Sequence, residues 1–177
     1  MRQPIQERAE LLLHGKIFDI VAASVRLPSG LAQDFWVVEH PGAVAVAPVL
    51  ETGEFLLVRQ YRHAVRDWLI EIPAGRLEPG ETPLAAAKRE LEEETGQRAQ
   101  RWEEIHSIFP APGFCSERIT LFEARDLGGP SGQRLQADAD EEIELVRMRP
   151  EELLDGATRD AKTLLAAALF LRRSARP

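Results

Sequence analysis

The first forty residues carry two apolar runs that are separated by turn signals. Residues 16–27 are extended in character and stop at a Pro-Ser-Gly turn at 28–30, and residues 32–40 form a second run that stops at a Pro-Gly pair at 41–42. Because Pro and Gly mark turns between strands, this pattern predicts a β-hairpin.

A second pair of strands is predicted further along. Residues 43–50 and 55–61 are rich in apolar and β-branched residues, and they flank the polar, Gly-containing turn at 51–54. This arrangement is typical of a hairpin. Residues 69–72 predict a short strand, which ends at a Pro-Ala-Gly sequence.

A helix is predicted to begin near Thr82 and to end at Gly96. Thr82 is a good N-cap residue, Pro83 suits the first helical position, and glycine commonly terminates helices. Three apolar residues share one face of this helix and are expected to pack in the core: Leu84, Ala87 and Leu91.

The second half of the chain predicts further strands and two helices. Strands are expected near 98–108, 118–125 and 142–149, a short helix begins at Pro150, and an Ala- and Leu-rich helix covers 158–173. Mostly strands, with one helix in the middle and another at the end, indicate an α+β fold with helices packed on a mixed sheet.

The polar face of the first helix carries the chemistry. Glu90, Glu93 and Glu94 lie three and four residues apart, so their carboxylates converge on one side. Arg89 is expected to pair with Glu93 at i+4. A hard divalent cation such as Mg²⁺ would neutralise these carboxylates and share its coordination shell with phosphates. By itself, the acidic run 92–94 is also compatible with a solvated helix face.

Composition limits the partners. The 177 residues fit one domain, 44% of them are hydrophobic, and the net charge is −7. An acidic protein is a poor ligand for a nucleic-acid backbone, so no nucleic acid is expected. The longest apolar run, 164–171, is too short to span a membrane, and no signal peptide is expected. One cysteine, Cys115, is compatible with a cytoplasmic protein.

Residues 75–97, GRLEPGETPLAAAKRELEEETGQ, resemble the Nudix box, a signature of enzymes that hydrolyse diphosphate linkages. Its fixed positions are all present: Gly75, Glu81, Arg89, Glu90, Leu91, Glu93, Glu94 and Gly96. The final aliphatic position departs from the pattern, because it holds Gln97. The resemblance implies a Nudix α/β/α sandwich.

Two flanking segments are similar to ADP-ribose pyrophosphatases of the Nudix family. They are RQYR at 59–62 and EIPAG at 71–75. Pro112 lies sixteen residues after Gly96, which looks like a further mark of that group. The resemblance covers roughly residues 43–150.

This resemblance implies a metal site. Glu90, Glu94 and the backbone carbonyl of Ala74 are the expected metal ligands, with Mg²⁺ as the expected ion and Mn²⁺ or Zn²⁺ left open. Gly75 and Arg89 are expected to have structural roles, since the arginine of the family orients the glutamates.

The general base is left open among several acidic residues. In ADP-ribose pyrophosphatases a glutamate on a loop before the last strand acts as base or metal ligand, and here that loop is 136–142. Glu141 matches the ligand position, but Ala139 stands where relatives often place the base. Glu141, Glu142 or Glu93 could therefore act, although a solvated acidic loop is an alternative.

Four residues are expected at the substrate. Arg62 matches a basic residue near the phosphates, although a surface arginine on an edge strand is an equal alternative. Glu71 is either a substrate contact or a structural partner for an arginine. Pro112 and Gly113 complete the set.

The expected reaction is Mg²⁺-dependent hydrolysis of ADP-ribose to AMP and ribose 5-phosphate. A Nudix hydrolase of another nucleotide sugar, such as GDP-mannose, and a non-catalytic ligand sensor are the alternatives. Residues 1–42 are expected to be a β extension that forms a homodimer, and residues 43–177 the Nudix domain. Phe35 or Trp36 is the expected partner for adenine stacking.

Overall fold

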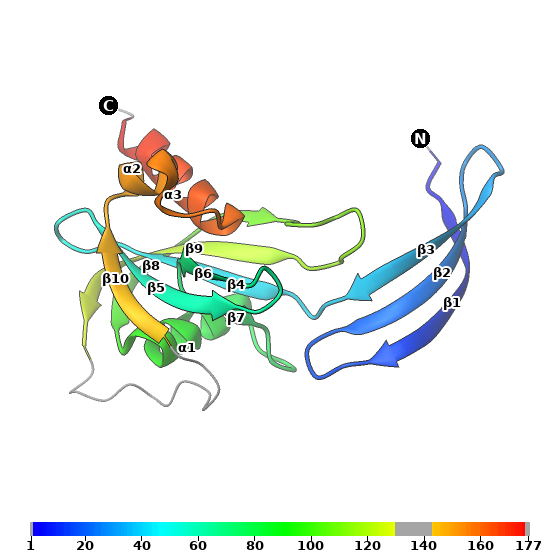
Figure 1. The fold of residues 1–177 in the computed structure, drawn as a ribbon, viewed down its shortest axis with the longest axis horizontal. Helices are drawn as coiled ribbons and strands as arrows, with labels where there is room; N and C mark the ends of the chain where they lie inside the picture. The colour runs from blue at the N-terminus through cyan, green and yellow to red at the C-terminus, as the bar shows by residue number, and fades with distance from the viewer. Residues whose placement is uncertain (1, 130–142, 176–177) are drawn as a thin grey trace. The chain divides into compact units, whose positions relative to one another are not determined.

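A computed structural model describes residues 2–129 and 143–175. The elements are, in chain order, β1 (Ile5–His14), β2 (Asp19–Arg26), β3 (Ala32–Glu39), β4 (Ala43–Pro48), β5 (Phe55–Arg62), β6 (Asp67–Glu71), β7 (Ala74–Arg76), α1 (Pro83–Thr95), β8 (Arg98–Ile108), β9 (Ile119–Gly128), β10 (Ile143–Met148), α2 (Pro150–Glu152), η1 (Leu153–Ala157) and α3 (Ala161–Ser174) (Figure 1).

The chain divides into two compact units. The N-terminal unit joins Met1–Gly42 to Phe109–Arg118, and the core unit joins Ala43–Ile108 to Ile119–Pro177. No helix in the described parts of the chain is long and apolar enough to cross a membrane.

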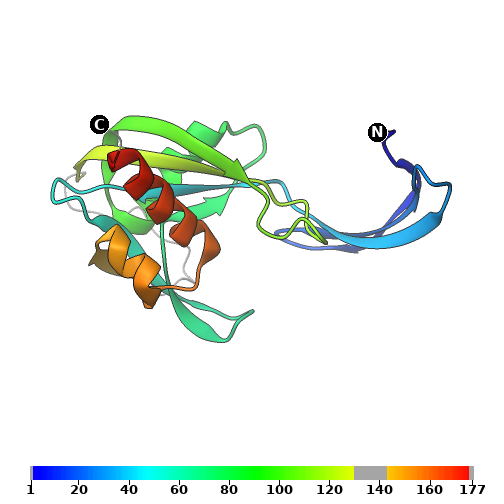
Figure 2. The same ribbon diagram turned by 90° about the horizontal axis from the view of Figure 1, so that it is seen from above.

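The N-terminal unit is built on an antiparallel sheet in the order β1-β2-β3. The predicted first hairpin is confirmed, because β2 pairs with β3 from Asp19 opposite Glu39 to Arg26 opposite Ala32. Strand β1 was not predicted. Its register with β2 shifts at two places, and such irregularities bend strands, in agreement with the curved sheet in Figure 2.

The core unit holds two sheets, in the orders β10-β5-β6 and β7-β4-β9-β8. Because β4 runs parallel to β9 and antiparallel to β7, the second sheet is mixed.

The predicted second hairpin is wrong in its pairing. The turn forms, and Val49 bridges Phe55, but β4 and β5 then enter different sheets. The reason is that every residue of β4 is buried, so both of its faces need covering. A strand of this kind lies inside a sheet, between two other strands, rather than in an isolated hairpin.

Strand β4 also divides the core into two layers. Val44 and Val46 pack with α1 residues, whereas Ala45 and Ala47, which point the other way, pack in the cluster that contains α3 residues. Helices α1 and α3 therefore cover opposite sides of the strands (Figure 1). The predicted α+β fold with a mixed sheet is confirmed.

Helix α1 has the predicted ends. Thr82 accepts a hydrogen bond from the Ala85 N–H at 3.3 Å, and Gly96 has the left-handed φ of 68° that terminates the helix. Ala87 and Leu91 are buried as predicted, but Leu84 is 39% exposed. That prediction is wrong because Leu84 lies in the first turn, away from the cluster that α1 forms with β4.

Candidate active site

Gly75 and Glu90 are in close contact where strand β7 passes helix α1. A β-carbon at position 75 would lie 2.0 Å from Glu90 Oε1, which is far inside van der Waals contact. Only glycine therefore allows the Glu90 carboxylate to lie over the strand. This contact gives a physical reason for the glycine that opens the motif.

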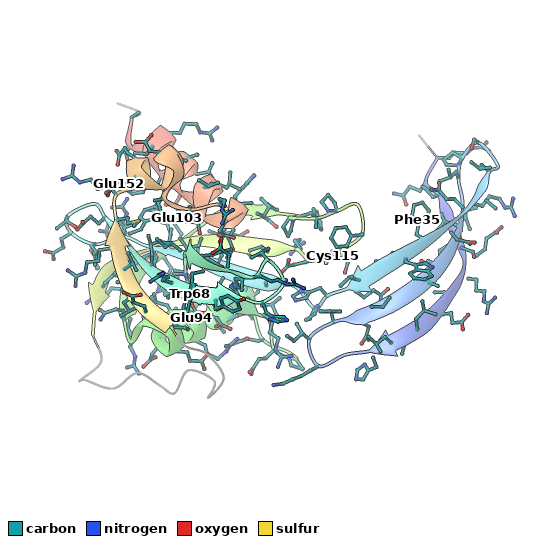
Figure 3. The ribbon with its side chains drawn as sticks, viewed as in Figure 1. Phe35, Trp68, Glu94, Glu103, Cys115 and Glu152 are labelled. Atoms are coloured by element: carbon teal, nitrogen blue, oxygen red, sulfur yellow. The ribbon has the colours of Figure 1, made fainter. Side chains whose placement is uncertain are left out.

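Glu94 of α1 contacts Ala74, the residue of β7 that precedes Gly75. Its Oε2 accepts a hydrogen bond from the Ala74 N–H at 3.2 Å, so α1 and β7 are linked through a carboxylate. Glu94 is buried and projects from α1 toward the strands (Figure 3). Ala74, Gly75, Glu90 and Glu94, four of the residues selected from the sequence, are thus brought together.

Arg89 connects the carboxylates around this position. Its guanidinium donates two hydrogen bonds to Glu81, at 3.1 and 2.9 Å, and one each to Glu90 at 2.6 Å and Glu93 at 2.9 Å. It also donates to the Arg76 carbonyl at 3.1 Å. The predicted i+4 contact with Glu93 is present, but Glu81 is the main partner and was not foreseen.

Arg89 and its carboxylate partners stabilise one another in their charged forms. The Glu81 carboxylate, with Glu90 and Glu93, raises the pKa of Arg89 above its ordinary value. In return, the hydrogen bonds from Arg89 lower the pKa of Glu81. Both groups therefore stay charged near neutral pH, and Arg89 offsets part of the repulsion between the carboxylates.

The residues at this position fit a hard divalent cation. Glu90 and Glu94 are both buried, and burying two carboxylates is costly unless cations balance them. Carboxylate and carbonyl oxygens are also the ligands that Mg²⁺ prefers. Within residues 2–129 and 143–175, no three His, Cys, Asp or Glu side chains already converge as a ligand set. Glu90 and Glu93 are both ion-paired with Arg89.

Arg62 and Glu71 form a second charged group. Glu71 accepts from Arg62 Nε at 2.7 Å and from Nη2 at 2.8 Å, so the pair is bidentate. Strand β5 lies between β10 and β6, so the alternative of an arginine on an edge strand is wrong. Burial would raise the pKa of Glu71, but Arg62 and Lys162 outweigh it and lower the pKa to about 2.

Residues at the start of α3 complete this second group, and sequence reasoning missed them. Lys162 forms an ion pair with Glu71 and another with Asp160, at 2.9 Å in the second case. Thr163 accepts a hydrogen bond from the Ile72 N–H at 2.9 Å. Lys162 and Thr163 are each 91 positions from Glu71 and Ile72, respectively, in the chain, and no local pattern indicates such contacts.

The remaining predicted residues lie elsewhere. Pro112 and Gly113 belong to the N-terminal unit, in a turn where Ala111 accepts a hydrogen bond from the Cys115 N–H at 2.9 Å. Trp36, one of the two residues expected to stack on adenine, is 74% exposed. Glu141 and Glu142 lie outside the described residues.

Comparison with known proteins identifies the family. The family model described as the NUDIX domain matches residues 39–167. This chain belongs to the Nudix family. It is similar to the ADP-ribose pyrophosphatase of Bacillus subtilis (strain 168), with 38% identity over 161 residues, which cover 89% of this chain and 86% of the relative.

Two other comparisons extend this result. The Nudix chain is 35% identical over 163 residues to the methanol dehydrogenase activator of Bacillus methanolicus, covering 90% of this chain and 88% of the relative. A crystal structure of an ADP compounds hydrolase superposes with a TM-score of 0.84 at 22% identity, covering 100% of this chain and 98% of that one, and it shows the same fold.

The family predicted from residues 75–97 is therefore confirmed, and with it the prediction of an enzyme that hydrolyses a diphosphate bond. Nudix hydrolases generally use a divalent metal ion. Among the described residues, the buried carboxylates of Glu90 and Glu94 have the chemistry to hold such an ion.

Proposed function

We propose that this Nudix protein hydrolyses the diphosphate linkage of ADP-ribose to AMP and ribose 5-phosphate, with Mg²⁺ as its metal. The observation that carries the proposal is the pair of buried carboxylates, Glu90 and Glu94, beside Ala74 and Gly75. The choice of ADP-ribose is supported by the Bacillus subtilis relative, an ADP-ribose pyrophosphatase, and by Pro112.

The residues of the chain would divide the work as follows. Glu90, Glu94 and the Ala74 carbonyl would hold the metal, which when bound neutralises phosphate charge and makes water a better nucleophile. Arg89 keeps the Glu90 carboxylate oriented through a hydrogen bond, and Glu81 in turn holds the guanidinium. Such supporting contacts commonly determine how well a metal site functions.

Substrate binding and proton transfer would involve other residues. Arg62 has N–H groups beyond the two that bind Glu71, so it can donate to a phosphate oxygen. Glu71 would act through Arg62, and Pro112 with Gly113 would contact the substrate. Glu93, Glu141 or Glu142 would accept the proton of the attacking water, and Glu141 is also a possible fourth ligand.

We also propose a cytoplasmic homodimer that residues 1–42 assemble, with residues 43–177 as the Nudix domain. A sheet in the N-terminal unit with exposed Leu11, Leu13 and Trp36 supports this proposal. The ligand is then a nucleoside diphosphate sugar, with no nucleic acid and no membrane as partners.

The test is product release from a panel of compounds: ADP-ribose, GDP-mannose, a dinucleoside polyphosphate, NADH and FAD. Each is assayed with Mg²⁺, Mn²⁺, Zn²⁺ or a chelator, using the wild type, Glu94→Gln and Glu92→Gln. Glu92 is a matched control, because it lies on the same helix and pairs with Arg98 outside the cluster.

We expect ADP-ribose with Mg²⁺ to give AMP fastest, and we expect the chelator and Glu94→Gln, but not Glu92→Gln, to abolish the reaction. A faster reaction with GDP-mannose would change the substrate and leave the chemistry intact. Binding of ADP-ribose without any cleavage would overturn the enzyme proposal in favour of a sensor.

A further inference from the structure

Lys162 lies in a charged cluster with Glu71 and Asp160, and Lys162 itself belongs to none of the motifs found in the sequence. Its ammonium group contacts Glu71 and is 2.9 Å from Asp160 Oδ1. Only 11% of the Lys162 side chain and 1% of the Glu71 side chain are exposed. A lysine this well buried contributes charge to its neighbours with little screening by water.

The start of α3 is fixed firmly enough to hold this lysine in place. Asp160 caps the helix by accepting from the Thr163 N–H at 2.9 Å and from its hydroxyl at 2.6 Å. Thr163 in turn accepts from the Ile72 N–H, and Thr158 donates its hydroxyl to the Ile70 carbonyl at 2.6 Å. Helix α3 is therefore bound to the end of β6 and to the residue that follows it.

The cluster is balanced in charge. Arg62 and Lys162 supply two positive charges, and Glu71 and Asp160 supply two negative ones. The pKa of Arg62 is raised by its interactions with Glu71 and Asp160, and also by the charge of Glu94 in the proposed metal site. With 39% of its side chain exposed, Arg62 is the member of the cluster that an anionic ligand can reach.

We propose that Lys162 is a positioning residue for the diphosphate, acting through Glu71 and Arg62. It neutralises the second carboxylate of the cluster, so that the charge of Arg62 is left to attract a phosphate. Without Lys162 the cluster would carry one net negative charge beside the proposed metal site and would repel an anionic substrate. The inference rests on the proposed function only in assigning the diphosphate to Arg62.

The charge balance gives the test. Lys162→Met removes the positive charge with little change in length, and Asp160→Asn removes one negative charge while leaving a good helix cap. The double variant is neutral again. Arg159→Met is the matched control, because Arg159 lies three residues earlier and pairs with Asp67 of β6 at an exposed position.

We expect Lys162→Met to raise KM for ADP-ribose by roughly tenfold with a smaller change in kcat, since the lost interaction acts on binding. The double variant Asp160→Asn/Lys162→Met should recover most of this KM, and Arg159→Met should leave KM unchanged. Calorimetric binding of inorganic pyrophosphate in the presence of Mg²⁺ should follow the same order.

A purely structural role predicts a different result. KM and pyrophosphate affinity would then be unchanged in Lys162→Met, kcat and thermal stability would fall, and the double variant would be no better. That outcome would overturn the inference. If the wild type fails to cleave ADP-ribose, the proposed function fails, and the pyrophosphate titration alone decides the role of Lys162.

Discussion

At the scale of single residues, the site depends on Gly75, which has no β-carbon, and on the guanidinium of Arg89, which binds three carboxylates. Gly75 leaves room for the Glu90 carboxylate, and Arg89 joins Glu90 to Glu81 and Glu93. Both features act on the position of carboxylates rather than on the substrate. Changes to either should therefore affect metal binding or stability before they affect anything else.

Gly75→Ala should displace the Glu90 carboxylate, because its β-carbon would lie 2.0 Å from Oε1. We expect Mg²⁺ affinity and kcat/KM to fall by about 10- to 100-fold, which is typical when the support of a metal ligand is lost. A Mg²⁺ titration of activity measures both. Gly128→Ala is the control, because its β-carbon would meet nothing within 4 Å. Equal losses in the two variants would contradict this explanation.

Arg89→Met should lower the free energy of unfolding, because it leaves several carboxylates close together without their counter-charge. Breaking a buried pair costs roughly 3–5 kcal/mol, but Arg89 is partly exposed, so we expect about 2 kcal/mol. Denaturant unfolding measures this. Arg101→Met removes an exposed pair with Asp126 and should leave the unfolding midpoint unchanged. An unchanged midpoint in Arg89→Met would show that the cluster has no net stabilising effect.

At the scale of elements, β6 and α3 are joined by charges. Glu71 ends β6 and pairs with Lys162 at the beginning of α3, and Lys162 also pairs with Asp160, the N-cap of that helix. Strand β7 starts three residues after Glu71, with Ala74. The helix start, the end of β6 and the proposed metal position therefore depend on one another.

This junction should make stability depend on acid. The pKa of Glu71 is lowered in the folded protein from 4.5 to about 2, so the folded state favours the charged carboxylate. The stabilisation is complete above pH 4.5 and is lost as the pH falls from there toward 2. Its size is about 3 kcal/mol, from 1.36 kcal/mol for each pKa unit.

Unfolding curves for the wild type and Glu71→Gln between pH 2.5 and 7 would isolate this contribution. We expect the difference in stability between the two proteins to shrink as the pH falls below 4.5. A difference that stays constant over the whole range would mean that Glu71 does not titrate in this way.

At the scale of the whole molecule, the N-terminal unit exposes apolar side chains that a monomer would leave in water. Trp36 of β3 is 74% exposed, and Leu11 and Leu13 of β1 are more than half exposed. Exposed apolar surface of this kind marks association sites, which agrees with the proposed homodimer.

Trp36→Glu should therefore weaken association by placing a charge in the proposed interface. Sedimentation should give about twice the 19.8 kDa chain mass for the wild type and a concentration-dependent shift toward one chain for the variant. Leu154→Glu, at an exposed position of the core unit, serves as the control and should remain dimeric. A wild type that sediments as a single chain would overturn the proposed dimer.

Features that depend on neighbours in the chain could be predicted from the order of the amino acids. The ends of α1 at Thr82 and Gly96 follow from local capping chemistry, and the hairpin of β2 and β3 follows from its turn. The position of Glu90 and Glu94 on one face of α1 follows from helical spacing. The motif that contains them was enough to identify the Nudix family.

Contacts between residues far apart in the chain became known only from the folded structure. Strand β4 pairs with β7 and β9 instead of the predicted β5. Every residue of β4 is buried, so the strand lies inside the core. Lys162 pairs with Glu71, which lies 91 residues away in the chain, and Arg89 pairs with Glu81, eight residues earlier. These contacts depend on how the sheets and α3 pack. Packing is a property of the whole core, so no local run of residues encodes them.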